Sequence, residues 1–119
     1  MNMSNINKDY KLLLNVETDE LIGDDLIFTD TDRFTSNIYV TVTPNLGDII
    51  LQMRIRTNTD EKVILEGQLV GQMVYEFNLP TDFIKLPGNH KMELQVIKGN
   101  YIRTSDPVNI KINRSITTR

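Results

Sequence analysis

Few residues of this 119-residue chain could support enzymatic chemistry, and His90 is its single histidine. A histidine that acts as a general base needs a nucleophile and an orienting acid, and no serine or aspartate stands at a recognisable triad spacing from it. Cysteine is absent, which removes disulfides, thiolate catalysis and Cys-based zinc sites. We therefore predict a non-enzymatic protein without a cofactor. We interpret His90 as an exposed turn residue or a side chain at the entry to a strand.

Four aspartates form the one cluster with metal-binding chemistry. Asp24, Asp25, Asp30 and Asp32 offer carboxylate oxygens from two neighbouring loops, as a Ca²⁺ site requires. The segment lacks the spacing and the glycine of an EF-hand, and Arg33 stands where ligands should continue. We therefore interpret the cluster as solvated turns and predict no metal site.

Carbohydrate chemistry has two candidate features. Glu66 and Glu76 resemble the paired carboxylates of a glycosidase, but a chain with 16 acidic residues offers such pairs by chance. Aromatic side chains could instead form a stacking platform for sugars, although tryptophan is absent. The four tyrosines are Tyr10, Tyr39, Tyr75 and Tyr101. A glycan-binding module therefore stays open as an alternative.

The composition is that of one folded globular domain. Hydrophobic residues make up 39% of the chain and charged residues 24%, which disfavours disorder and coiled coils. The net charge of -3 comes from 16 acids and 13 bases without a long run of either sign, so nucleic acid is not an expected partner. Residues 1–9 lack an apolar segment and residues 12–14 are too short for a signal core or a membrane span. We predict no signal peptide and no membrane insertion.

Apolar side chains alternate with polar ones between Ile38 and Ile112, which is typical of half-buried strands. The clearest example is the segment 49–57, where Leu51, Met53 and Ile55 share one face. Further strands are expected at residues 34–43, 63–69, 73–79, 91–98, 101–105 and 108–112, with a short apolar piece at 26–28. Residues 10–16 are expected to form a first strand, with a helical turn as the alternative. Gly67 is expected to mark a bulge, Phe83 to fill a connection, and Pro87 and Gly88 to form a turn.

Seven or eight short strands separated by turns predict an all-β, antiparallel β-sandwich of immunoglobulin-like type. A small barrel is the alternative. The pattern divides the chain into a flexible N-terminal tail (1–9), a single sandwich domain (10–113), and a polar tail or the start of a linker (114–119). These boundaries follow from the start of the first expected strand and the end of the last one.

Three segments in the second half resemble the N-terminal domain of baseplate upper proteins from tailed phages of Gram-positive bacteria. They are residues 71–80 (GQMVYEFNLP), 86–94 (LPGNHKMEL) and 103–110 (RTSDPVNI). That family has a strand ending in Pro, a Pro-Gly corner leading into a strand, and a closing strand after Thr-Ser. The similarity extends over roughly residues 28–112. His90 stands where the family more usually has an aromatic residue.

The resemblance implies a structural part of a virion, made in the host cytoplasm and located in the tail baseplate. Such a domain docks on neighbouring tail subunits, forms a homo-oligomer in the particle and supports the receptor-binding apparatus. Its contacts would be made by outward-facing side chains. The candidates are Arg54, Arg56, Tyr39 and Tyr101. The alternative function is a free-standing immunoglobulin-like module that binds glycan or protein.

Overall fold

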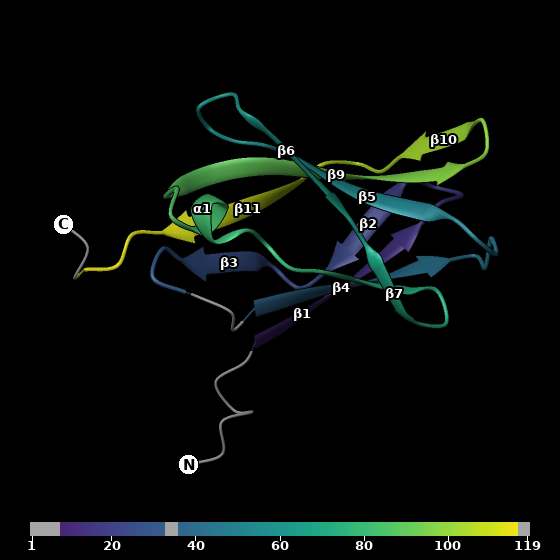
Figure 1. Cartoon of the computed structure of the whole chain (residues 1–119), viewed down its shortest axis with the longest axis horizontal. Coiled ribbons are helices and arrows are strands. Elements are labelled where there is room, and N and C mark those ends of the chain that lie inside the picture. The colour runs from purple at the N-terminus through teal and green to yellow at the C-terminus, as the bar shows by residue number, and fades with distance from the viewer. Residues whose placement is uncertain (1–7, 33–35, 117–119) are drawn as a thin grey trace, which may run out of the picture.

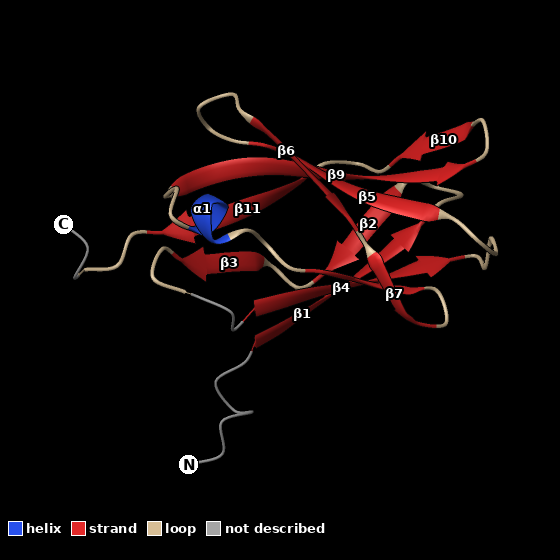
Figure 2. Cartoon of the chain, viewed as in Figure 1, coloured by secondary structure: helices blue, strands red, loops and turns tan. Residues whose placement is uncertain are grey.

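The computed structural model describes residues 8–32 and 36–116 as a two-sheet sandwich with one short helix (Figures 1 and 2). The strands are β1 (Lys8–Asn15), β2 (Glu20–Gly23), β3 (Leu26–Thr29), β4 (Ser36–Thr43), β5 (Ile50–Arg56), β6 (Lys62–Glu66), β7 (Gln68–Gly71), β8 (Val74–Phe77), β9 (Gly88–Lys98), β10 (Tyr101–Thr104) and β11 (Val108–Asn113), and the helix is α1 (Thr81–Ile84). The predicted all-β sandwich is confirmed, with eleven strands over the described ranges in place of seven or eight. Residues 1–7 and 117–119 of the predicted tails and the expected strand start at Phe34 lie outside the described residues.

One sheet has the strand order β2-β1-β4-β8-β7 and the other the order β3-β11-β9-β5-β6, with β10 paired to β9. Most neighbours are antiparallel, as predicted, but β1 pairs with β4 and β3 pairs with β11 in parallel. Parallel neighbours need a crossover connection. Here β2 and β3 lie between β1 and β4 in the chain, and β3 belongs to the opposite sheet.

The predicted alternation of faces is confirmed in the long strands. In β5 the side chains of Leu51, Met53 and Ile55 are buried, while Arg54 and Arg56 face outward. The same two-residue period buries the inner faces of β4 and β9. The buried residues of those two strands are Ile38, Val40 and Val42 in β4 and Met92, Leu94 and Val96 in β9.

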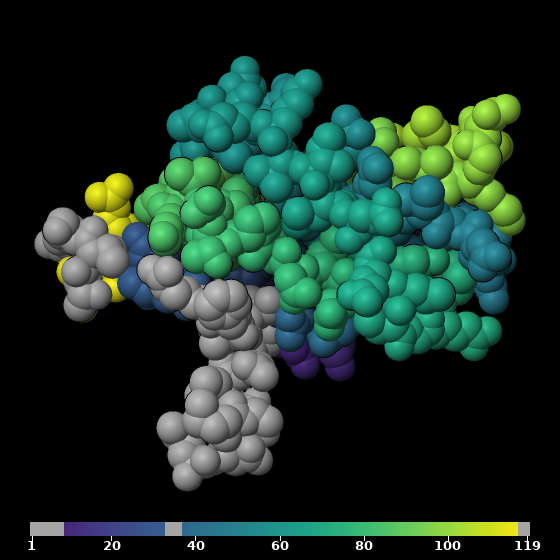
Figure 3. Space-filling view, in the orientation of Figure 1, coloured from purple at the N-terminus to yellow at the C-terminus, as the bar shows by residue number. Residues whose placement is uncertain are grey.

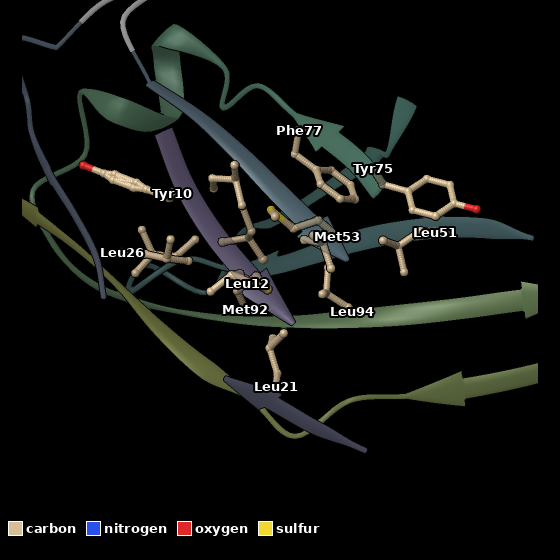
Figure 4. Packing of buried hydrophobic residues seen from close by; sticks show 14 of the residues in the cluster. Tyr10, Leu12, Leu21, Leu26, Leu51, Met53, Tyr75, Phe77, Met92 and Leu94 are labelled. Atoms are coloured by element: carbon tan, nitrogen blue, oxygen red, sulfur yellow. The ribbon is translucent and has the colours of Figure 1, made fainter. Parts of the chain in front are cut away.

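The core fills the space between the sheets as one continuous cluster. Leu51, Met53 and Leu94 approach from one sheet and Tyr75 and Phe77 from the other (Figure 4). Removing this apolar surface from water is the main force that holds the sheets together.

The chain passes from one sheet to the other at Gly67. Strands β6 and β7, on either side of this residue, belong to different sheets, so the segment predicted as a single strand is two strands. A Cβ atom at Gly67 would lie 2.7 Å from Cζ of Phe77, which explains why only glycine fits. The predicted bulge is displaced to the pairing of β7 with β8, between Leu69 and Gly71.

Strand β2 was not expected, because its four residues lie between two turn-like segments. It forms an edge strand against β1, and Leu21 points into the core. At its end Gly23 has φ +143°, and a Cβ atom there would lie 2.2 Å from the carbonyl oxygen of Lys11. The chain then crosses to the other sheet and begins β3. A short strand flanked by turns carries too few apolar positions to show its period.

The connection after β8 contains the helix α1, where only an irregular connection was predicted. Phe83 and Ile84 are both buried, so the expected filling role of Phe83 is confirmed. The turn lies at Lys85 and Leu86, two positions before the expected one. Gly88 is the first residue of β9 and has φ +127°. Its close neighbour is Nδ2 of Asn58, 2.3 Å from the position that a Cβ atom would take.

His90 joins this corner to the loop between β5 and β6. It is 1% exposed, which corrects the expectation of an exposed turn residue and supports that of a strand-entry side chain. Its Nδ1 accepts a hydrogen bond from the backbone N–H of Asn58 at 3.0 Å, so Nε2 carries the proton and donates to the carbonyl of Leu86 at 2.8 Å. The ring also packs on Phe83, with 4.9 Å between ring centroids.

Introducing an aspartate should lower the free energy of unfolding much more on the inner face of β5 than on its outer face. Met53→Asp places a carboxylate in the core and should lower the free energy of unfolding by about 3 kcal/mol or more. Arg56→Asp, on the outward face of the same strand, should change it by no more than about 1 kcal/mol. Urea unfolding of both variants measures the difference. Equal losses would show that the assigned register of β5 is wrong.

The hydrogen bonds of His90 predict a second stability difference. His90→Leu keeps an apolar side chain but leaves the N–H of Asn58 and the carbonyl of Leu86 without their partner, and should cost about 2–4 kcal/mol. Asn89→Leu, at the exposed neighbouring position, should cost less than about 1 kcal/mol. Thermal unfolding followed by circular dichroism checks both variants. A His90→Leu variant as stable as Asn89→Leu would contradict the anchoring role.

Candidate interaction surface

The four predicted interaction residues occupy three separate parts of the surface. Arg54 and Arg56 share the outward face of β5, in the six-stranded sheet. Tyr39 lies on β4, in the other sheet, and Tyr101 begins β10. In Figure 3 the hairpin of β9 and β10 (yellow-green) projects at one end, away from the β5–β6 loop (teal) at the top. The structure therefore does not combine the four residues into a single site.

Tyr39 is partly exposed and lies opposite Glu76 of β8 in the sheet register. A hydrogen bond between the two side chains raises the pKa of the Tyr39 hydroxyl, because it favours the neutral phenol. Tyr10 and Tyr75 are buried core residues, 6% and 4% exposed. The four tyrosines therefore do not form the stacking platform that a glycan-binding site would need.

Tyr101 is 66% exposed on a hairpin that is tied to the opposite sheet. Arg103 of the same strand donates from Nε and Nη2 to the Asp19 carboxylate, at 2.5 and 3.2 Å. Hydrogen bonding to this carboxylate raises the pKa of the Arg103 guanidinium. Asp19 adopts φ +63° in the turn between β1 and β2, and its carbonyl accepts a hydrogen bond from the N–H of Asp106. These contacts position the hairpin that carries Tyr101.

Beside Arg54 and Arg56, the outer face of the six-stranded sheet has a shallow depression of about 480 Å³ between β5, β6 and β9. Its lining is mainly basic and apolar, with one acidic residue. The lining residues are Arg54, Ile55, Arg56, Lys62, Val63, Ile64, Lys91, Met92, Glu93 and Pro107. Sequence reasoning singled out the two arginines but not the lysines, which come from other strands.

The strand register shows how these charges are ordered. Arg56 lies directly opposite Lys62 of β6 on one side and Lys91 of β9 on the other. We call Lys62, Arg56 and Lys91 the basic row. Arg54, two residues earlier, lies opposite Glu93 and donates from Nη1 to Oε1 of Gln95 at 3.3 Å. Arg54 therefore has polar partners across the sheet, in contrast to the basic row.

The same outer face carries an apolar row that the sequence pattern did not reveal. Ile97 of β9 pairs with Ile50 of β5 and with Ile102 of β10. Ile50 is 45% exposed and Ile102 is 60% exposed. Three isoleucines in register on the solvent side are a small patch that a partner protein could cover.

The acidic cluster is used within the fold. Asp24 accepts a hydrogen bond from the backbone N–H of Lys11 at 2.8 Å, and Asp32 accepts one from the N–H of Thr29 at 2.9 Å. Asp30 accepts one from the N–H of Ser115 at 2.9 Å. Within residues 8–32 and 36–116, no three His, Asp or Glu side chains are gathered as metal ligands. The carboxylates therefore hold separate backbone groups.

The remaining catalytic candidates are also separated or engaged. Glu66 lies in β6 and Glu76 in β8, on strands of different sheets. Both ring nitrogens of His90 are occupied by backbone groups in a buried setting, which leaves neither free for a substrate proton. None of the helices described is long and apolar enough to cross a membrane.

Comparison with known proteins identifies a similar fold. A solved structure described as the N-terminal domain of phage TP901-1 ORF48 superimposes with a TM-score of 0.66. The match covers 88% of this chain and 98% of that chain, at 6% sequence identity. No family model matches the sequence, and neither does any curated protein. At such low identity the likeness concerns the fold, and this chain is therefore similar in fold to the N-terminal domain of a phage protein.

Proposed function

We propose that this chain is a non-enzymatic structural domain of a phage tail baseplate. In this proposal it docks on neighbouring tail subunits, forms a homo-oligomer in the virion and supports the receptor-binding apparatus. The observation that carries the proposal is the fold likeness to a phage N-terminal domain, which spans 98% of that domain. The resemblance of residues 71–80, 86–94 and 103–110 to baseplate upper proteins points in the same direction.

The distribution of reactive groups also supports an assembly role. His90, Asp24 and Asp32 make hydrogen bonds that hold strands and loops together. The outward faces instead carry a basic depression and an exposed apolar row, which are features that contact other proteins. The hydrogen bonds of these polar groups thus stabilise the fold, whereas the basic depression and the apolar row face outward and are available to contact a partner.

The proposal predicts assembly with tail proteins. The chain should associate at micromolar concentration with at least one tail protein encoded by the same genome, in a complex of defined mass by light scattering. A specific protein–protein interface of ordinary size buries about 1,600 Å². We expect copies of the isolated domain to bury less than this between them, and therefore to self-associate weakly until a partner adds contacts.

Failure to associate with any of these tail proteins would overturn the virion assignment. The free-standing binding module would then replace it. A glycan array tests that alternative directly, with Tyr101→Ala as the variant that should remove binding because Tyr101 is the most exposed tyrosine.

A further inference from the structure

The basic row places three cations directly opposite one another on adjacent strands. Arg56 faces Lys62 and Lys91 in the register of β6, β5 and β9. Side chains at such positions are about 5 Å apart at Cβ, and like charges there destabilise the sheet. The chain as a whole carries a net charge of -3, so this row is opposite in sign to the net charge of the chain.

Little within the described part of the chain neutralises the row. The one ion pair there joins Nε of Arg56 to Oδ1 of Asp60 at 3.7 Å, with the two side chains 63% and 85% exposed. An ion pair that is so open to solvent contributes little. Neither lysine of the row has an ion pair among residues 8–32 and 36–116. The like charges of the row are therefore not offset in the isolated domain, and solvent screening weakens their repulsion as it weakens the ion pair.

The row lies in a depression that suits an extended segment. The depression of about 480 Å³ is open to solvent, and Ile64 and Pro107 add apolar surface beside the charges. Carboxylates on alternate residues of an extended chain are about 7 Å apart, and neighbouring strands of the row are about 4.8 Å apart. The flexible Lys and Arg side chains can bridge this difference.

We propose that the basic row is the docking site for an acidic, extended segment of a neighbouring protein chain. Carboxylates of the segment would pair with Lys62, Arg56 and Lys91, and its apolar side chains would contact Ile64 and Pro107. Charge complementarity of this kind fixes register and speeds association. The inference rests on the proposed function only in naming a tail subunit as the source of the segment.

A protein segment fits this surface better than a nucleic acid. The row is three cations wide, and Glu93 lies in the same depression. A long polyanion would extend beyond the row onto a domain with net negative charge, whereas nucleic-acid binding requires many phosphate contacts. An acidic peptide needs only two or three carboxylates and gains from the apolar lining.

The test uses the full chain and a fluorescein-labelled peptide in which Glu and Val alternate, and binding is followed by fluorescence anisotropy. The row variant combines Lys62→Gln, Arg56→Gln and Lys91→Gln. A control variant of equal net charge combines three exposed substitutions away from the row: Lys11→Gln, Lys85→Gln and Arg114→Gln. Circular dichroism confirms that both variants are folded.

We expect the row variant to bind the peptide about tenfold more weakly than the unmodified chain, and the control variant to bind within about twofold of it. Raising the salt from about 50 to about 300 mM should weaken binding to the unmodified chain, because ions screen exposed charges. The row variant should also melt at or above the temperature of the unmodified chain, since its like-charge contacts are gone.

Three results would overturn the proposal. The first concerns peptide binding: either the row variant binds the peptide as tightly as the unmodified chain, or the unmodified chain shows no binding at millimolar peptide. The second is a melting temperature of the row variant several degrees lower, which would make the row a stabilising feature. The third is tighter row-dependent binding of a single-stranded oligonucleotide of equal charge, which would replace the protein segment with a nucleic acid.

The outcome can be separated from that of the proposed function. Tail proteins that assemble equally well with the row variant and the unmodified chain would refute the docking site and leave the baseplate role intact. Row-dependent peptide binding without any tail-protein association would support the docking site and refute the baseplate role.

Discussion

The eleven residues of β9 pair with three other strands, and the six-stranded sheet depends on this pairing. One edge of β9 bonds to β5, and the other bonds first to β11 and then to β10. Its inner side chains Met92, Leu94 and Val96 are almost completely buried, so β9 joins backbone pairing to core packing along its length. At its first residues His90 anchors the β5–β6 loop. Loss of this strand would separate β5 and β6 from β11 and β3.

Local alternation made the long strands predictable, because a two-residue period sustained over seven or more residues is typical of a strand with one buried face. It correctly assigned the buried faces of β4, β5 and β9. It did not reveal which strands belong to which sheet. At the crossings, Gly23 and Gly67 lie so close to Lys11 and Phe77, which are 12 and 10 residues away, that a Cβ atom would not fit, and a local pattern does not show such approaches.

The candidate site was predictable to a smaller extent. The pattern of β5 indicated that Arg54 and Arg56 face outward, and the structure agrees. The partners that give Arg56 its significance, Lys62 and Lys91, could be identified only once the register of β6 and β9 was known. Likewise the pairing of Asp19 with Arg103 joins residues 84 positions apart. Periodicity reports the face on which a side chain lies, and only tertiary pairing reports its neighbours.

The apolar row and the basic row differ in their effect on the stability of the isolated domain. Ile97 lies between Ile50 and Ile102 in the strand register, and apolar pairs at such positions stabilise a sheet while leaving apolar surface exposed. The basic row gains nothing from its own members, because each neighbour of Arg56 across the sheet repels it. Stability of the isolated sandwich therefore does not explain why three cations occupy these positions. The acidic segment proposed above would account for it, since the same three charges would become favourable with carboxylates between them.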